Sequence, residues 1–460
     1  MAMVIQKSKK KRYAVLPAAG IFGKAMQSAV FRDGHGKSLV HIAAHQLQTF
    51  DGFATANTVV AGAGMAATEI ADAISEADFE VISQRFADGP AMVRMTDAAK
   101  LALAASNPGF RIVAITRYNL PGFKRAKKGQ PAALPSAVTA ADANGVVFVA
   151  DAKQHFLGGA NFGNHQNGRD VIVGLIDNGV DNTHPALVDA VALLRCYIPG
   201  VNENAGGPVN WGPLNNDRAG HGTHVAGIIA ARPGHNGPAG IAPEAHIISY
   251  RVFPDDATGV KGAENLPIID SIRAAIEDQC HIINLSLEGP SLKDDGVRTA
   301  IADAWNQGVV CIAAAGNGFG APVSYPAQLP PCVAVSAIGR DGAFPNFPEL
   351  QQYVSNQRST VDPAVFLASF SNFGPRVQFT APGHGVVSTF PGGEWWFNSG
   401  TSMAAPFVAG VLALLLSGNN NVLNMVGNAE RSTAMLHMLI ARAKRLNLPQ
   451  VAHEGYGLPA

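Results

Sequence analysis

Short, strongly apolar runs alternate with longer segments of helical periodicity from about residue 150 to the end of the chain. The apolar runs read VIVGLID, HIISYRVF, HIINLSL, VVCIAAAG, CVAVSAIG and VQFTAPG, and the helical segments are predicted at residues 221–231, 265–278 and 294–307. Nearly continuous apolar strands that alternate with helices favour a parallel sheet that is covered on both faces. Residues 151–460 are therefore predicted to form an α/β domain with a mostly parallel central sheet, interrupted by a surface loop at residues 345–363.

The front of the chain has a different pattern, which predicts a small α+β domain at residues 61–120. Strands are expected at 79–83, 91–95 and 110–115, with a helix at 96–105. Thr96 can cap this helix, and the Asn-Pro-Gly sequence at 107–109 ends it. Residues 121–150 are rich in Pro, Ala, Lys and Arg without a sustained period, so they are predicted to be a linker with a processing site. Residues 1–60 receive no assignment.

Composition limits the classes of partner. The 460 residues exceed one ordinary hydrophobic core, and 47% hydrophobic with 15% charged residues describe a compact protein. The formal net charge is zero, which argues against nucleic acid or an anionic surface as the partner. The basic run at residues 7–12 is interpreted as a solvated tail, and no apolar run is long enough for a membrane span.

The cysteines and the N-terminus bear on the compartment. Three of the four cysteines, Cys280, Cys311 and Cys332, lie in or beside apolar runs, where a buried thiol needs no disulfide; the fourth is Cys196. This mildly favours a reducing compartment. The apolar stretch at 13–23 is interrupted by Pro17 and lacks a small-x-small cleavage site, so it is interpreted as a strand and turn. A cytoplasmic location is slightly favoured, and secretion is left open.

Polar residues end several of the predicted strands. Asp177 ends the first strand of the α/β domain, Ser286 lies near the end of another, and Asn317 follows a third. Because ligand sites in open α/β sheets form outside the carboxyl ends of the strands, these residues are expected to share one site.

Three motifs in order point to nucleophilic catalysis: Asp177 in LIDNGVD, His221 in HGTHVAG and Ser402 in SGTSMAAP. Together they suggest an orienting carboxylate, a general base and a nucleophile. Taken singly, Ser402 could be a helix cap and Asp177 a turn aspartate. Asp181 is a second candidate carboxylate in the same turn.

Two further side chains have competing interpretations. His221 and His224 have a spacing that suits a metal, but no third ligand motif accompanies them, so one is expected to be catalytic and the other a hydrogen-bonded core residue. The Asn317 amide can donate to an oxyanion, although an asparagine before glycine is more often a turn residue.

These residues together resemble the subtilases, the subtilisin-like serine proteases, over residues 150–460. The resemblance implies that Asp177 orients the base, that His221 is the base and that Ser402 is the nucleophile. It also implies that Asn317 and the Ser402 amide hold the oxyanion. Two segments are implied to contact substrate: Ser286, Leu287, Glu288 and Gly289 by pairing with its backbone, and Ala314, Ala315 and Gly316 as the wall of the specificity pocket.

The front domain resembles a subtilase propeptide in its order of strands, helix and Asn-Pro-Gly. The resemblance implies that it assists folding and occupies the site until the linker is cut. The expected partners are thus a protein or peptide substrate and the chain's own N-terminal domain.

Four positions depart from the family pattern. Ala186 and Gly234 stand where the family has calcium ligands, so no cofactor is expected and the main calcium site is lost. Phe407 replaces a structural histidine. Glu288 replaces a glycine beside the substrate channel, and we hypothesise that its carboxylate favours Lys or Arg near the cleavage site.

The function expected from the sequence is that of a serine endopeptidase acting through an acyl-enzyme and made as a self-processed zymogen. One alternative is a catalytically silent peptide-binding module with the same fold. The other is a maturation protease dedicated to one partner peptide.

Overall fold

The computed structural model describes residues 100–101, 116–120, 167–198, 217, 219–256, 259–260, 262–290, 295–342 and 348–459, together with six strands before residue 116. The chain divides into two compact units, one built mainly from residues 1–116 and one built mainly from residue 117 onward.

The front unit contains a four-stranded antiparallel sheet. Its strands, in spatial order, are β4 (Phe79–Gln84), β5 (Ala91–Met95), β1 (Lys11–Leu16) and β6 (Arg111–Ala114). The three strands predicted between residues 79 and 115 are thus present. Lys100 and Leu101 are helical, and the rest of the predicted helix lies outside the described residues. Strand β1 lies between β5 and β6, so the sheet also uses residues before position 61. A hairpin precedes β4: β2 (Ser28–Arg32) and β3 (Ser38–Ala43).

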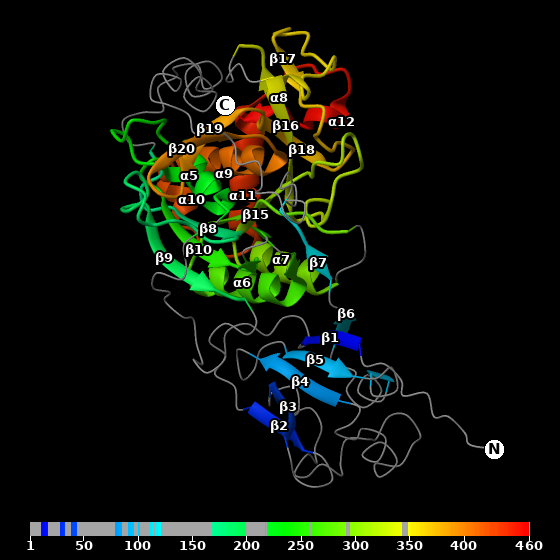
Figure 1. Cartoon of the computed structure of the whole chain (residues 1–460). Helices are drawn as coiled ribbons and strands as arrows, with labels where there is room; N and C mark the ends of the chain where they lie inside the picture. The colour runs from blue at the N-terminus through cyan, green and yellow to red at the C-terminus, as the bar shows by residue number, and fades with distance from the viewer. Residues whose placement is uncertain are drawn as a thin grey trace, which may run out of the picture. The chain divides into compact units, whose positions relative to one another are not determined.

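The main unit is built on an eight-stranded sheet (Figure 1). Its spatial order is β17-β16-β15-β14-β8-β10-β9, and β18 also pairs with β16. All pairs are parallel except β16 with β17. The strands are β8 (Ile172–Asp177), β9 (Val191–Cys196), β10 (His246–Arg251), β14 (Ile282–Leu285), β15 (Val310–Ala314), β16 (Val333–Arg340), β17 (Val365–Leu367) and β18 (Val377–Pro382). The predicted fold class is confirmed.

Helices cover the two faces of this sheet. Helices α5 (His221–Ala230) and α9 (Thr401–Ser417) pack together on one face, and α11 (Ala429–Arg442) packs on α9. Helices α6 (Asn265–Glu277) and α7 (Asp295–Asn306) lie on the other face (Figure 1). The three helices predicted between residues 221 and 307 each match within one residue at either end.

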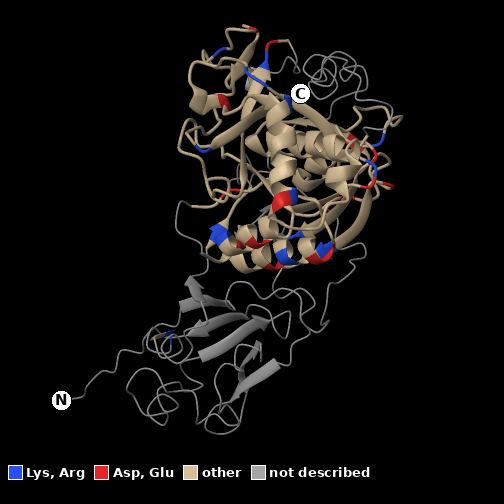
Figure 2. Cartoon of the chain, turned by 180° about the vertical axis from the view of Figure 1, so that it is seen from behind, with Lys and Arg blue, Asp and Glu red and all other residues tan. Residues whose placement is uncertain are grey.

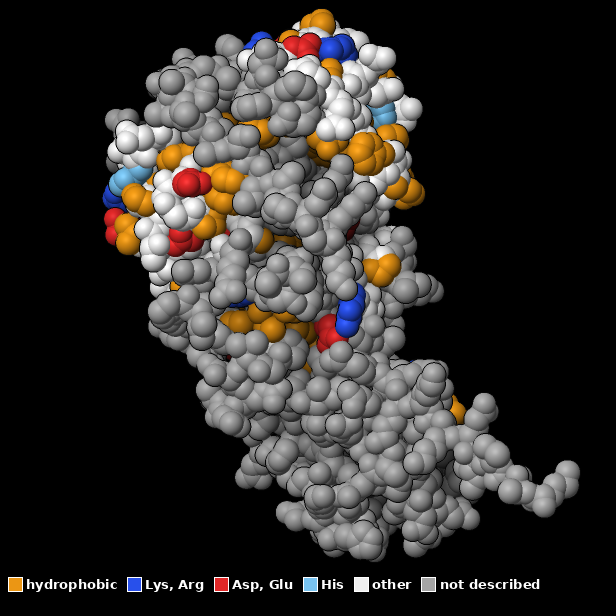
Figure 3. Space-filling model, in the orientation of Figure 1, with side chains coloured by type: hydrophobic (Ala, Val, Ile, Leu, Met, Phe, Trp, Pro, Cys, Tyr) orange, Lys and Arg blue, Asp and Glu red, His pale blue; other side chains and the backbone are white. Residues whose placement is uncertain are grey.

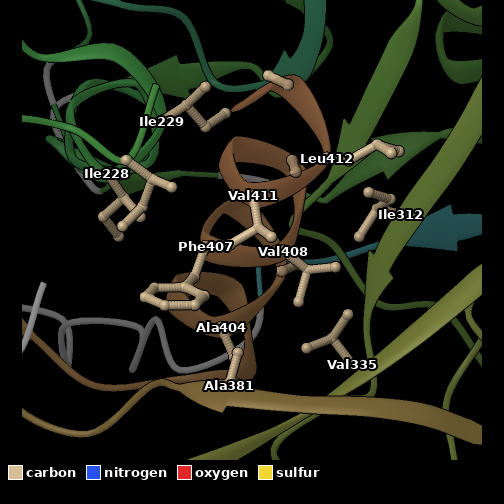
Figure 4. Packing of buried hydrophobic residues seen from close by; sticks show 14 of the residues in the cluster. Ile228, Ile229, Ile312, Val335, Ala381, Ala404, Phe407, Val408, Val411 and Leu412 are labelled. Atoms are coloured by element: carbon tan, nitrogen blue, oxygen red, sulfur yellow. The ribbon is translucent and has the colours of Figure 1, made fainter. Parts of the chain in front are cut away.

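Helix α9 lies in the middle of the hydrophobic core. Every residue from Thr401 to Leu416 is buried, because side chains on one flank meet α5 and those on the other meet the sheet (Figure 4). Phe407, the departure from the family histidine, is fully buried in this core. All four cysteines are buried and none forms a disulfide, as expected for small hydrophobic residues.

The shorter elements complete the main unit. A hairpin that the sequence analysis did not predict joins β19 (Val386–Phe390) to β20 (Glu394–Asn398). The predicted loop at 345–363 contains a short helix, α8 (Pro348–Gln351), and the buried Ser359, whose hydroxyl donates to the Leu446 carbonyl. The others are β7 (Arg117–Tyr118), β11 (Asp255–Asp256), β12 (Gly259–Val260), β13 (Ala263–Glu264), α10 (Asn420–Leu423), β21 (Ala443–Lys444), α12 (Val451–Glu454) and β22 (Leu458–Pro459).

The described surface is mixed in character. Basic and acidic residues alternate along the coloured part of the ribbon in Figure 2, in keeping with the zero net charge. Hydrophobic side chains on the face in Figure 3 are interspersed with polar ones. Within the described residues, no helix is both long enough and apolar enough to cross a membrane.

Candidate active site

A buried carboxylate–imidazole pair lies at the carboxyl edge of the parallel sheet. Asp177 is the last residue of β8, and its Oδ1 accepts a hydrogen bond of 2.8 Å from Nδ1 of His221, the first residue of α5. The Asn178 amide also donates to Oδ1, at 2.8 Å. Both side chains of the pair are at most 1% exposed. A carboxylate held to Nδ1 fixes the tautomer in which Nε2 can accept a proton.

A second buried carboxylate, Asp217, holds the N-terminus of α5. Its Oδ1 accepts from the Gly220 amide and from Asn178 Nδ2, each at 2.7 Å, and its Oδ2 accepts from the Thr223 amide at 2.9 Å. Burial raises the pKa of Asp217, while the amide donors oppose that rise. This residue was not among those predicted from the sequence motifs. The available signal was that Ala219 and Gly220, just before α5, offer no side-chain cap, so the helix amides needed an acceptor from nearby.

The second histidine of the motif is a core residue. Nε2 of His224 donates to the carbonyls of Val386, at 3.0 Å, and Trp396, at 3.1 Å. Burial lowers its pKa to about 3, so the ring stays neutral at physiological pH. This matches the expectation that one histidine of the pair is hydrogen-bonded in the core.

Ser402 is the second residue of α9 and is buried. The N-cap of α9 is Gly400, and no side chain caps the helix, so Ser402 is not its cap. The Ser286 hydroxyl donates to the Ser402 carbonyl at 2.8 Å, and the Ser402 Oγ lies 3.4 Å from the Ser286 carbonyl oxygen. The start of α9 is thus tied to the chain that leaves β14.

Asn317 follows β15, the strand beside β14. Its Oδ1 accepts from the Thr401 amide at 3.0 Å and from the Thr401 hydroxyl at 2.8 Å. Because the amide oxygen is used in this way, Nδ2 is the group that remains for donation. Asp177 ends β8, and Ser286 and Asn317 follow β14 and β15, so the three residues lie at the carboxyl ends of three adjacent parallel strands, as expected from the sequence.

A short stretch of the chain pairs with the segment after β14. Asn119 and Glu288 exchange both backbone hydrogen bonds, of 2.6 and 2.8 Å. On its other side, β7 pairs antiparallel with β13. Tyr118 is fully buried against Gly289, where a Cβ would lie 2.6 Å from the tyrosine ring. Residues 117–119 thus form the middle strand of a small antiparallel sheet.

The Glu288 side chain reaches the segment after β15. Its Oε2 accepts from the backbone N–H of Asn317 at 3.2 Å and lies 3.4 Å from the Ser324 hydroxyl oxygen. A Cβ on Gly316 would lie 2.7 Å from the same oxygen. Burial raises the pKa of Glu288, and the two hydrogen bonds oppose that rise. Of the other predicted contact residues, Leu287, Ala314 and Ala315 are fully buried.

Neither Asp181 nor the two positions at which the family has calcium ligands, Ala186 and Gly234, belongs to a cluster of metal ligands. Asp181 accepts from the Thr183 amide and hydroxyl and from the Gly392 amide, so it stabilises a turn. Ala186 is buried, and Gly234 has nothing within 4 Å of a Cβ. Among the described residues, no group of three His, Cys, Asp or Glu could hold a metal ion.

Comparison with known proteins gives one consistent family. The model of the subtilase family matches residues 168–457. Subtilisin E of Bacillus subtilis (strain 168) is 36% identical over 258 residues, which are 54% of this chain and 56% of the relative. The thermophilic serine proteinase of Bacillus sp. (strain AK1) is 37% identical over 252 residues, 54% of this chain and 53% of the relative. Subtilisin of Bacillus pumilus is 35% identical over 258 residues, 54% of this chain and 78% of the relative. The chain spans about half the length of the first relatives it matches.

Proposed function

The chain belongs to the subtilase family, and we propose on this basis that it is a serine endopeptidase. The observation that carries the proposal is the buried pair of Asp177 and His221, joined at 2.8 Å at the carboxyl edge of the sheet. The names of the relatives, which include subtilisins and a serine proteinase, support the same activity.

In the proposed mechanism, Ser402 Oγ attacks the substrate carbonyl carbon and gives its proton to Nε2 of His221. The tetrahedral intermediate then collapses, its C–N bond breaks, and His221 returns the proton to the leaving amine. Water repeats the sequence on the acyl-enzyme and releases the acid. The buried Asp177 carboxylate stabilises the imidazolium that forms in both halves.

The oxyanion is proposed to be held by Asn317 Nδ2 and the Ser402 amide. The bonds from Thr401 to Asn317 Oδ1 support this role, because they fix the amide plane and leave Nδ2 as its donor. The Ser402 amide lies in the first turn of α9, where backbone donors favour developing negative charge.

We further propose that the protein is made as a self-processed zymogen. The support is residues 117–119, which pair with β13 on one side and Glu288 on the other, as an extended peptide substrate would. A chain that occupies these backbone groups excludes another peptide until it is cut and released.

The activity is tested by labelling with a fluorophosphonate probe and by casein hydrolysis. The wild type is expected to label and to cleave casein, whereas Ser402→Ala does neither. In subtilisin, removal of the catalytic serine lowers kcat by a factor of about 10⁶, and a loss of this order is expected here. The control is Ser369→Ala, because the half-buried Ser369 hydroxyl makes only a long bond of 3.4 Å, and it should behave as wild type. An unlabelled wild type that binds peptides without cutting them would make the chain a peptide-binding module. Labelling without casein cleavage would favour a dedicated maturation protease.

A further inference from the structure

Glu288 places a carboxylate between two segments of the site. Its backbone lies on the segment that pairs with Asn119. Its Oε2 reaches across to the backbone N–H of Asn317 and to the Ser324 hydroxyl. The 2.7 Å separation between Oε2 and a Cβ built on Gly316 shows how closely the carboxylate approaches the opposite wall. The carboxylate thus lies in the space between residues 286–289 and residues 314–316, and does not point away from the site.

The pairing of Asn119 gives the register of an extended peptide in this position. In an antiparallel pair, a residue two positions further along one strand lies opposite the residue two positions earlier on the other. The residue two positions after the partner of Glu288 is therefore opposite Ser286. The Ser286 carbonyl oxygen lies 3.4 Å from Ser402 Oγ. That residue of a bound peptide accordingly supplies the carbonyl that Ser402 attacks.

The carboxylate accepts two hydrogen bonds but is partly withdrawn from water. Burial raises its pKa, and the only contributions that oppose the rise are the bonds from Asn317 and Ser324. Within the described part of the chain, no Lys, Arg or His is within ion-pair distance of Glu288. A half-buried anion of this kind is stabilised by a cation that brings charge-assisted hydrogen bonds.

We propose that Glu288 makes this protein select Lys or Arg at the residue whose carbonyl is attacked. The proposal rests on the proposed peptidase function and narrows its substrate class. The ammonium or guanidinium group of the substrate would pair with Oε2, which lies between residues 286–289 and residues 314–316. A neutral side chain of the same length leaves the carboxylate without a cation and gains no such contact.

Two positions after Asn119 the chain has Pro121, so processing after a basic residue requires a later part of the linker to take this position. The residues that follow the paired segment include Lys124, Arg125, Lys127 and Lys128. They lie within the linker that the zymogen proposal requires to be cut. The proposal therefore predicts that a self-processed product begins immediately after one of these four residues.

The test uses peptides that copy the paired segment, Arg-Tyr-Asn-Leu-X followed by a fluorogenic amine, with X as Lys, norleucine or Ala. Norleucine has the length of Lys without its charge. For the wild type we expect kcat/KM to be about tenfold or more higher for Lys than for norleucine. In Glu288→Gln, which keeps the shape and removes the charge, the ratio should fall to about one. In Glu288→Gly, norleucine should become the better substrate because the space is open and apolar.

Fluorophosphonate labelling of Ser402 in every variant separates the possible failures. If all variants label equally and the wild type prefers Ala or norleucine to Lys, the carboxylate only fills space and the inference is wrong. If Lys is preferred equally by wild type and Glu288→Gln, another residue selects it and the role of Glu288 is refuted. If neither labelling nor hydrolysis occurs in the wild type, the peptidase function fails and this inference fails with it.

Discussion

At the scale of single residues, the buried histidines make the free energy of unfolding depend on pH. Burial lowers the pKa of His224 to about 3 and those of His281 and His384 to about 4. In the unfolded chain these rings titrate near 6.5. Between pH 6.5 and about 4, these histidines are therefore protonated in the unfolded state and remain neutral in the folded state. Each histidine should lower the free energy of unfolding by up to about 1.4 kcal/mol per pH unit in this window, and by nothing above it.

Urea unfolding between pH 8 and pH 5 checks this prediction. The free energy of unfolding should be flat above about pH 7 and fall as the pH drops below 6.5. His384→Phe should make the fall shallower, because it removes one of the three buried rings that titrate. Phenylalanine suits this position, because the His384 ring already packs among aromatic side chains. The exposed His437 provides the control, and His437→Gln should leave the slope unchanged. A wild-type curve without a slope between pH 6.5 and 5 would contradict neutral burial of these rings.

Single residues also show what the sequence could and could not predict. Asp177 and Asn317 were placed correctly at strand ends, because a polar residue after an apolar run marks the carboxyl edge of a parallel sheet. Periodicity could not choose between His221 and His224. The choice depends on where carbonyls 162 and 172 residues away lie, and both face His224. Asp217 was missed because the backbone amides that donate to it, those of Gly220 and Thr223, take up their positions only once α5 has formed.

At the scale of elements, Gly220 is the position where α5 is most sensitive to substitution. Its φ is 81°, in the left-handed region, and a Cβ there would lie 1.9 Å from the Phe390 ring. Gly220→Ala is therefore expected to cost about 1 kcal/mol for the backbone and more for displacing the ring. Because His221 follows directly, kcat/KM should fall as well.

Gly234→Ala is the matched control for this prediction. Gly234 also has a left-handed φ, of 90°, but a Cβ there would meet nothing within 4 Å. It should lose only the backbone contribution, about 1 kcal/mol, and keep wild-type kcat/KM. Thermal unfolding and peptide hydrolysis measure the two effects. Equal losses of stability and activity in the two variants would mean that contact with Phe390 has no role at the N-terminus of α5.

The elements differ in how readily they could be predicted. The buried strands β8, β10, β14, β15, β16 and β18 are continuous apolar runs, so pattern alone located them. The β19–β20 hairpin was missed although Gly392 and Gly393, with φ of 86° and 81°, form the kind of glycine turn that links antiparallel strands. Helix α11 was missed as well, because only Ser432, Met435 and Leu439 are buried and the rest of its surface is mixed.

At the scale of the whole molecule, the α/β fold of the main unit follows from alternation of apolar runs and helices. The strand order does not, because the sequence lacks a signal for which strand lies beside β8. That order places β8, β14 and β15 together and so brings their carboxyl ends to one site. The front unit was only partly predictable. Residues of its strand β1 pair with residues 76 to 101 positions further along the chain, a pairing that local pattern cannot reveal.

The central claim is that Ser402 makes this chain a peptidase that processes itself. Intact mass of the purified chain over time, for wild type beside Ser402→Ala, tests it most directly. The wild type is expected to lose its front segment through a cut between Asn119 and Asp151, after one of the basic linker residues, while Ser402→Ala keeps its full mass. Two full-length chains with a Ser402 that does not react with fluorophosphonate, or the same cut in both chains, would contradict the account.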